Sequence, residues 1–336
     1  MALFVGDPSA PTRFGTDVAD TSDATGLFLK MFGGEVFAAF SEKVHTADKH
    51  VVKEINAGKS AQFPKTWKVS AAYHTAGQEM LGQDTDETER VISIDGLLVS
   101  HIGIYDLDEA MSHFEVRSQY TSELGKALAR VFDTNVYRTI VKTARADSSL
   151  AGAASTSPFP DGTIITSADV TGTIAAAGGE EWHEVMRDMQ VDADERNYDG
   201  DMWLAVPPAT FDGTAYSQAA GTATNPFMFA DRRTMTGEGF GQDMEELRVR
   251  KVKMFMSNLI PQSNDSANAD VKAKYRADYS TTLGVGWGRE GVGTVKLIGM
   301  GIEQTRDVRR QEDFVVAKIA VGHGPLRNEI TWEVTA

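Results

Sequence analysis

The pattern of apolar and polar positions is clearest between Val91 and Arg145. From Val91 to Tyr105 the chain is rich in isoleucine, valine and leucine in near-alternation with polar residues, which is typical of a half-buried strand. Asp106 and Glu109 follow at the spacing of a capping box, in which an N-terminal carboxylate and a Glu three residues later begin a helix. We therefore expect a strand that passes directly into a helix at Asp106.

A set of side chains then recurs at three- and four-residue spacing, which places them on one face of a helix. They are Leu107, Met111, Phe114, Thr121, Leu124, Leu128, Val131 and Asn135. No proline lies between Pro64 and Pro158, so no proline ring ends the helix before about Ala146. Acidic residues precede basic ones along the segment, as the helix dipole favours. The sequence predicts one helix of roughly 40 residues, about 60 Å long at 1.5 Å per residue.

The first 24 residues are polar and contain prolines and glycines, which is typical of a flexible arm. A stretch with apolar side chains at helical spacing follows: Leu27, Phe28, Met31, Phe32, Val36, Phe40 and Val44. The pair Gly33-Gly34 costs roughly 1–2 kcal/mol relative to alanines and predicts a bend or break there. This apolar helix packs either on its own domain or on a partner surface.

Residues 57–104 have the pattern of a long β-hairpin. Phe63, Lys65, Trp67 and Val69 share one face of its first limb, a turn region spans Thr75–Gly82, and the chain returns from Val91. A two-stranded ribbon is marginally stable in water by itself. We therefore expect this hairpin to lie on another chain.

The second half of the sequence alternates loop-rich and periodic segments. A stretch rich in Ala, Ser, Thr and Gly from Ala144 to Gly179 predicts a boundary. The predicted elements after it are a helix at Glu180–Asp194, a buried strand at Met202–Val206, a strand at Leu247–Leu259 and further strands within residues 282–336. Hairpin, long helix, inserted mixed subdomain and returning strands together predict an α+β fold.

The composition narrows the function classes. The 336-residue chain has no cysteine, which excludes disulfides, thiol nucleophiles and thiolate zinc sites. No run of 18 apolar residues is present, so we expect no membrane span. The net charge of −15 argues against broad nucleic-acid binding. It serves either solubility alone or a negative wall along which enclosed DNA slides without sticking.

No motif predicts a catalytic, cofactor-binding or metal-binding residue. Gly286-Trp-Gly288-Arg-Glu-Gly291 matches a dinucleotide-binding pattern, but β-branched strand sequence follows it where a helix is required, so we expect a turn there. His183-Glu184 lacks the second histidine of a zinc helix, since position 187 is Arg. Asp192-Ala-Asp194 starts like a calcium loop but lacks its later ligands.

Five segments together resemble the major capsid protein of short-tailed, double-stranded-DNA phages. They are LFLKMFGGEVFAAF from Leu27, GKSAQFP from Gly58, the segment Val91–Ala129, GVGTVKL from Gly291 and AVGHGPLRNE from Ala320. They stand in the family's order and at compatible spacing, and they cover the first 145 and the last 50 residues. The middle, about 148 to 280, resembles the family poorly.

The resemblance implies the tailed-phage capsid fold and a division of this chain. The expected parts are an N-terminal arm (1–56), an extended loop and strand (57–104), a spine helix of the peripheral domain (105–150), an axial domain (151–285) and return strands of the peripheral domain (286–336). Some shells of this fold join a lysine of the extended loop to an asparagine of a neighbour. The residue types that this linkage needs are present in the chain, at Lys59, Lys65, Lys68 and Asn328. The short-tailed family, however, is not one with which we associate that linkage.

The function that the resemblance implies is structural rather than enzymatic. The chain would assemble as hexamers and pentamers into an icosahedral head that encloses double-stranded DNA without sequence-specific binding. Its partners would be itself, a scaffolding protein and a portal protein, and its location the virion capsid, assembled in the host cytoplasm. The expected intersubunit contacts are Leu27, Phe28, Met31, Phe32, Phe40, Phe63, Trp67 and Tyr73. The alternatives are a cargo-enclosing shell of the same fold and, remotely, a nucleotide-binding enzyme that uses Gly286–Gly291.

Overall fold

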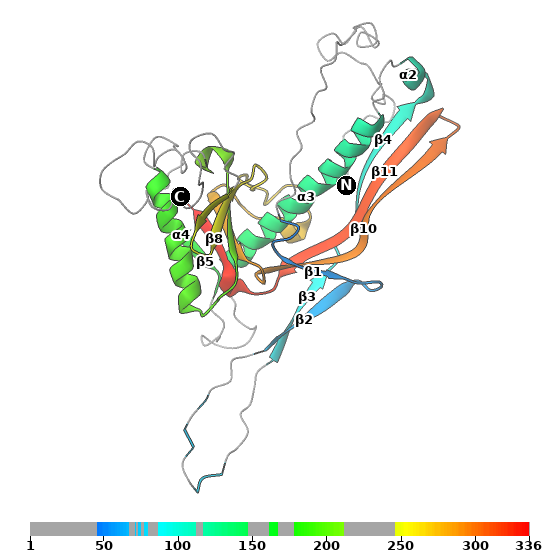
Figure 1. Ribbon diagram of the computed structural model, residues 1–336. Helices are drawn as coiled ribbons and strands as arrows, with labels where there is room; N and C mark the ends of the chain where they lie inside the picture. Colours follow the sequence, from blue (N-terminus) through cyan, green and yellow to red (C-terminus); the bar gives the residue numbers. More distant parts are fainter. Residues whose placement is uncertain are drawn as a thin grey trace.

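The computed structural model describes residues 46–66, 71, 73–74, 77–79, 87–111, 117–146, 161–166, 178–211 and 246–335. These residues form three sheets and three longer helical segments, arranged as two bodies that share one helix (Figure 1). A long four-stranded sheet makes one body and a six-stranded sheet the other. A separate two-stranded hairpin points away from both. Within the described residues no helix is both long and apolar enough to cross a membrane.

The four-stranded sheet has the order β1-β10-β11-β4. Its strands are β1 (Val51–Glu54), β4 (Leu97–Tyr105), β10 (Val292–Asp307) and β11 (Glu312–Pro325). The long strands β10 and β11 are antiparallel neighbours, and β4 pairs antiparallel with β11. Strand β1, which falls within the expected N-terminal arm, pairs parallel with β10. The described end of that arm is therefore part of the sheet.

The predicted strand from Val91 to Tyr105 is two strands in two different sheets. Strand β3 (Glu87–Ser93) pairs with β2 (Ser60–Thr66) as a hairpin, whereas β4 joins the four-stranded sheet. Between them Gly96 adopts a φ of +112°, which side chains with a Cβ rarely reach. Both strands are half-buried, so apolar and polar residues alternate on each side of the break. The alternation alone therefore did not reveal where one strand ends and the next begins.

The predicted passage from strand into helix is confirmed. Strand β4 ends at Tyr105, α2 covers Asp106–Met111, and the 29-residue α3 covers Arg117–Arg145. Residues 112–116 lie outside the described residues, so the continuity of a single 40-residue helix stays a prediction. The Asp106 carboxylate accepts a hydrogen bond from the Arg306 guanidinium at 2.5 Å. Helix α3 is about 43 Å long at 1.5 Å per residue and ends close to the predicted Ala146.

The single apolar face predicted from Leu107 to Asn135 is confirmed only at Leu124 and Leu128. Leu124 and Leu128 are buried against Val315 and Ala317 of β11, but Val131 is 41% exposed and Leu107 is 63% exposed. The next buried side chains are Val136, Tyr137, Ile140 and Val141, which pack against the six-stranded sheet. At 3.6 residues per turn, Val136 and Ile140 lie roughly 120° and 160° around the axis from Leu124. The buried face changes because the helix changes its partner sheet.

The six-stranded sheet has the order β5-β12-β9-β6-β8-β7. Its strands are β5 (Thr163–Thr166), β6 (Met202–Val206), β7 (Glu246–Val249), β8 (Val252–Met256), β9 (Thr282–Gly288) and β12 (Thr331–Thr335). Helix α4 (Gly178–Glu195) covers one face and the second half of α3 covers the other. Short helical turns at Ala273–Tyr275 (η1), Asn328–Ile330 (η2) and residues 208–211 complete the described elements.

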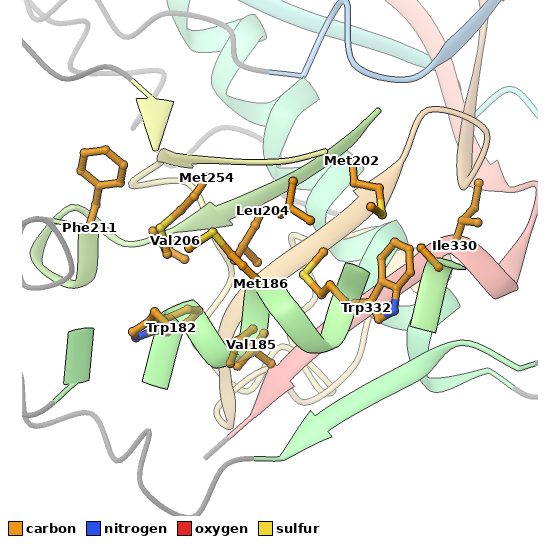
Figure 2. Close-up of a cluster of buried hydrophobic side chains, with 14 residues drawn as sticks. Trp182, Val185, Met186, Met202, Leu204, Val206, Phe211, Met254, Ile330 and Trp332 are labelled. Carbon is orange, nitrogen blue, oxygen red and sulfur yellow. The ribbon is translucent and has the colours of Figure 1, made fainter. Parts of the chain in front are cut away.

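The core beneath α4 confirms two predictions. The helix predicted at Glu180–Asp194 is α4, and the strand predicted at Met202–Val206 has the same bounds as β6. In Figure 2, Trp182, Val185 and Met186 of α4 lie against Leu204 and Val206 of β6. The strand predicted at Leu247–Leu259 is wrong as one element, because β7 and β8 form a tight hairpin there. Arg250 has a φ of +52° at its turn.

The glycines predicted to form a turn at Gly286–Gly291 have two different roles. Gly286 and Gly288 lie in β9, and only residues 289–291 turn. A Cβ on Gly286 would stand 2.6 Å from the Met189 methyl group of α4. The opposite face of β9 carries Val285 and Trp287 toward α3. A side chain at position 286 would force the Met189 side chain to shift, because α4 lies close to the strand, and this close approach was not visible in the sequence.

Basic residues near the end of α3 bind specific partners. The Arg145 guanidinium donates two hydrogen bonds of 2.6 Å to the carboxylate of Glu333, which is fully buried in β12. The Arg138 guanidinium contacts the Asp265 carboxylate at 2.5 Å. The sequence predicted only a favourable interaction with the helix dipole. The first ion pair attaches α3 to the six-stranded sheet, and the second attaches it to the loop that precedes β9.

We expect Leu128→Ala to destabilise the subunit by about 2–4 kcal/mol, because it removes buried contacts with β11 and leaves a cavity. Val131→Ala on the same helix is the matched control, and we expect it to change the free energy of unfolding by less than about 0.5 kcal/mol. Urea unfolding of the unassembled subunit measures both. Equal losses for the two variants would contradict the change of face along α3.

Candidate assembly surfaces

The two sheets are joined where the chain crosses between them twice. Residues 289–291 connect β9 of the six-stranded sheet to β10 of the four-stranded sheet, and residues 326–330 connect β11 to β12. The two crossings touch, because the Gly291 carbonyl accepts hydrogen bonds from the backbone N–H groups of Leu326 at 3.0 Å and Arg327 at 3.3 Å. A Cβ on Gly291 would lie 2.8 Å from the Thr331 methyl group. We call residues 288–292 and 325–331 the junction.

The hairpin is attached to the junction by a buried ion pair. The Lys65 ammonium of β2 donates to the Glu329 carboxylate at 3.1 Å, and both residues are less than 10% exposed. Burial lowers the pKa of Lys65, and the neighbouring Glu329 carboxylate opposes that shift. Removing one partner alone would leave a buried charge without compensation, which is strongly destabilising. The pair therefore fixes the base of the hairpin to the body of the subunit.

The aromatic residues predicted for the hairpin surface have different environments. Phe63 is half-buried and packs with Ile92 of β3 and Val295 of β10, and the Lys53 ammonium lies 5.0 Å from its ring centroid. Tyr73 is fully exposed. Trp67 lies outside the described residues, as do Leu27, Phe28, Met31, Phe32 and Phe40 of the arm. The structure thus assigns Phe63 largely to the subunit's own core and leaves Tyr73 free to contact a neighbour.

Two buried histidines connect the start of the described chain to the four-stranded sheet. His50 Nε2 lies 2.7 Å from the Thr294 hydroxyl, which lies 2.8 Å from His323 Nδ1, and His50 Nδ1 lies 2.5 Å from the Thr46 carbonyl. Burial lowers the pKa of both rings, that of His323 to about 3. Both rings are therefore neutral near pH 7. No local pattern in the sequence predicted this pair, because the two residues lie more than 270 positions apart.

Three exposed apolar side chains lie at the outer end of the four-stranded sheet, where α2 and the turn between β10 and β11 meet (Figure 1). Leu107 is 63% exposed, Val308 is 68% exposed and Met111 is 36% exposed. Large apolar side chains with this exposure mark a candidate contact surface. Leu107 and Met111 were predicted to share one face of the long helix, and no role was predicted for Val308. An apolar residue within the polar turn sequence DVRRQ was the available signal.

The candidate motifs for chemistry have structural partners instead. The Asp192 carboxylate accepts hydrogen bonds from the Trp332 indole at 2.6 Å and from the Thr163 hydroxyl at 2.8 Å. Asn328 donates to the Ala146 carbonyl. Lys68 of the linkage hypothesis lies outside the described residues. In the part of the chain that is described, no three His, Asp or Glu residues gather as a metal site would require.

Comparison with known proteins points to one family. A family model described as "Gp10A-like: Major capsid protein" matches residues 62–335. The major capsid protein of Escherichia phage T7 is 32% identical over 347 aligned residues, which cover 98% of this chain and 97% of that protein. The major capsid protein of Enterobacteria phage T3 is 31% identical over 348 residues, covering 92% of this chain and 91% of that protein.

Solved structures agree with the sequence comparisons. The capsid structure of the cyanophage P-SCSP1u superimposes with a TM-score of 0.74 at 32% identity and covers 97% of this chain and 98% of that chain. The mature capsid of bacteriophage PhiM1 gives a TM-score of 0.67 at 18% identity, with 91% of each chain covered, which supports the fold alone. The α+β capsid fold expected from the resemblance is therefore confirmed.

We expect the subunit to lose stability as the pH falls below about 6.5, because the two buried histidines bind protons more readily in the unfolded chain. The loss begins at the unfolded pKa of about 6.5 and continues down toward the folded values, at up to about 1.4 kcal/mol per pH unit for each ring. Urea unfolding between pH 7.5 and 5 measures it. His323→Gln should reduce the slope by about half, and an unchanged slope would contradict this assignment.

Proposed function

The chain belongs to the Gp10A-like family of phage major capsid proteins, and from this membership we infer how it builds the icosahedral head. The chain self-associates into the shell of the virion. We propose hexamers and pentamers as its building units. The similarity to the T7 major capsid protein carries this proposal, because the two proteins are 32% identical over an alignment that covers 98% of this chain and 97% of that protein.

The proposed division of the chain follows the two bodies of the structure. The four-stranded sheet with α2 and α3 serves as the peripheral domain (105–150 and 286–336), and the six-stranded sheet with α4 serves as the axial domain (151–285). Residues 57–104 form the extended loop and the strand that follows it, and residues 1–56 form the arm. Strand β12 departs from this scheme, since it returns to the six-stranded sheet. The axial domain therefore includes the last strand.

The proposed intersubunit contacts are the apolar arm helix and the hairpin. Leu27, Phe28, Met31, Phe32 and Phe40 would dock on a neighbour, together with Trp67 and Tyr73 of the hairpin. The described body has buried clusters on both faces of the six-stranded sheet and between α3 and the four-stranded sheet, and none of the residues in these clusters belongs to the arm helix. Each subunit then contacts several neighbours, and many moderate contacts add up through multivalency. Such head-to-tail contacts close only when ring size and curvature match.

Scaffolding and portal proteins complete the proposed assembly. A scaffolding protein would set the curvature of the shell, and a portal would occupy one vertex for DNA entry. The net charge of −15 suits an inner wall that repels the phosphate backbone, so that double-stranded DNA is enclosed without sequence-specific binding. Nucleotide binding at Gly286–Gly291 has no support, because these glycines join antiparallel-paired strands rather than a strand and a helix.

The direct test is electron microscopy of the full chain expressed with its scaffolding and portal partners. We expect closed icosahedral particles with hexamers on the faces and pentamers at the vertices. Expression without the scaffolding protein should give misformed shells or open sheets. A chain that stays monomeric under both conditions would contradict the proposal.

Removal of residues 1–45 should leave a folded subunit that does not form shells. The buried side chains in the described part of the chain begin at Thr46 and are all retained, whereas the predicted apolar helix Leu27–Phe40 is lost. Thermal melting tests the fold, and sedimentation velocity tests assembly. Removal of residues 1–24 alone is the control and should preserve assembly, because it retains the apolar helix. Closed shells at normal yield from the longer truncation would reject the role of the arm.

Two aromatic substitutions on the hairpin should separate folding from assembly. Tyr73→Ala should leave the melting temperature of the unassembled subunit unchanged, since this side chain is fully exposed. It should weaken shells against denaturant, because aromatic anchors contribute about 2 kcal/mol or more at interfaces. Trp67→Ala should behave in the same way.

Phe63→Ala is the contrasting variant, and it should lower the melting temperature of the subunit because Phe63 packs on Ile92 and Val295. Unchanged shells with Tyr73→Ala and Trp67→Ala would show that the hairpin does not carry an interface.

A further inference from the structure

A small cavity lies beside the junction, where the end of α3, strand β3 and the η1 turn meet. Its volume is about 210 Å³. The residues that define its chemistry are Arg90, Thr139, Lys142, Lys274, Tyr275 and Asn328. Pockets for small organic ligands usually measure about 300–1,000 Å³. This cavity therefore accommodates one side chain or a small ion rather than a nucleotide.

The cavity contains more positively charged side chains than carboxylates that pair with them among the described residues. Lys274 has a carboxylate partner, since its ammonium lies 3.0 Å from Asp95. Lys142 donates to the Lys274 carbonyl at 2.7 Å, and no carboxylate of the described residues pairs with it. Burial lowers the pKa of Lys142. The Arg90 guanidinium has neither a hydrogen bond nor an ion pair within the part of the chain that is described. Two cations thus lack a counterion in a chain whose net charge is −15.

The cavity also contains a buried acceptor without a donor. Asn328 is 2% exposed, and its Nδ2 donates to the Ala146 carbonyl at 3.1 Å. Its Oδ1 is buried and has no hydrogen-bond partner among the described residues. A buried acceptor left without a partner costs about 1–3 kcal/mol. A ligand that brings both a negative charge and a hydrogen-bond donor would therefore satisfy these groups.

We propose that this cavity receives an Asp or Glu side chain from a neighbouring copy of the chain in the shell. The incoming carboxylate accepts hydrogen bonds from Arg90 and Lys142, and a backbone N–H of the same segment donates to Asn328 Oδ1. The inference deepens the proposed function, because it names one contact through which subunits recognise each other. Charge-assisted hydrogen bonds of this kind are stronger than neutral ones and impose a defined geometry.

Two observations favour a second copy of the chain as the source of the carboxylate. The chain assembles with itself, and it carries 48 acidic residues against 33 basic ones, so every neighbour presents carboxylates. A free carboxylate ion has no donor for Asn328 Oδ1, whereas a peptide segment has one in each backbone N–H. The position beside the junction also places the contact at the base of the hairpin, where Lys65 and Glu329 attach that element.

The first test is zero-length carbodiimide cross-linking of assembled shells built from a mixture of ¹⁴N- and ¹⁵N-labelled chains. We expect an amide between Lys142 and an Asp or Glu whose two peptides carry different isotopes, which identifies the bond as intersubunit. Lys142→Arg should form normal shells without that amide, because it keeps the cation and removes the reactive amine. Shells that show other intersubunit amides but only intrachain products at Lys142 would overturn the inference.

The second test replaces Arg90, whose guanidinium has no hydrogen bond or ion pair with any described residue. Arg90→Gln should melt like the natural subunit but require roughly tenfold more subunit for half-maximal assembly, as expected for one lost charge-assisted contact. Arg187→Gln, at an exposed position of α4 outside the junction, is the control with the same change in net charge and should assemble normally. Equal assembly of the two variants would overturn the inference.

Two further arms distinguish other sources of negative charge. If the Lys142 amide and the Arg90 effect appear equally in DNA-free shells, DNA phosphate is not the occupant, and we expect that result. If inorganic phosphate stabilises the isolated subunit and Lys142 forms no amide in shells, the cavity binds a free anion and the inference is wrong. Failure to form any shell would instead contradict the proposed hexamer and pentamer assembly, and the inference with it.

Discussion

The packing of α3 against both sheets is the constraint on which the rest of the structure depends. Leu124 and Leu128 close the core over the four-stranded sheet, and Val136 and Ile140 close the core over the six-stranded sheet from a different face of the same helix. The two bodies therefore cannot move independently without breaking one of these cores. The two hydrogen bonds from the Arg145 guanidinium to the Glu333 carboxylate also attach the end of the helix to the six-stranded sheet.

The junction concentrates the connections that matter for assembly. The two chain crossings, the end of α3 and the base of the hairpin all meet there, held by the hydrogen bonds to the Gly291 carbonyl and by the Lys65–Glu329 pair. A neighbour that binds the hairpin or the adjacent cavity therefore acts on both sheets at once. In the proposed assembly, the folding energy of the subunit and the association energy between subunits are carried by largely different side chains. Phe63 belongs to the first group, and we assign Tyr73 to the second.

Chemistry-like motifs in this sequence have packing explanations. Gly286 allows α4 to approach β9, and the Asp192 carboxylate holds the Trp332 indole. The buried histidines His50 and His323 form part of a hydrogen-bonded chain through Thr294. A protein whose function is assembly uses such residues to fix the shape of its surfaces. The motifs were weak as sequence signals: strand sequence follows the glycine motif where a helix is required, His183-Glu184 lacks the second histidine, and the Asp192 loop lacks its later ligands.

The sequence by itself determined the elements whose pattern is local. The bounds of β6, the helix α4 and the passage from β4 into α2 at Asp106 were predicted, because side-chain period and turn residues act over a few positions. The resemblance of ordered segments determined the family. The tertiary structure decided which sheet each strand joins, where the buried face of α3 changes and which charges pair. These features depend on residues far apart in the chain, so no local period specifies them, and only packing against a particular neighbour distinguishes buried Val136 from exposed Val131.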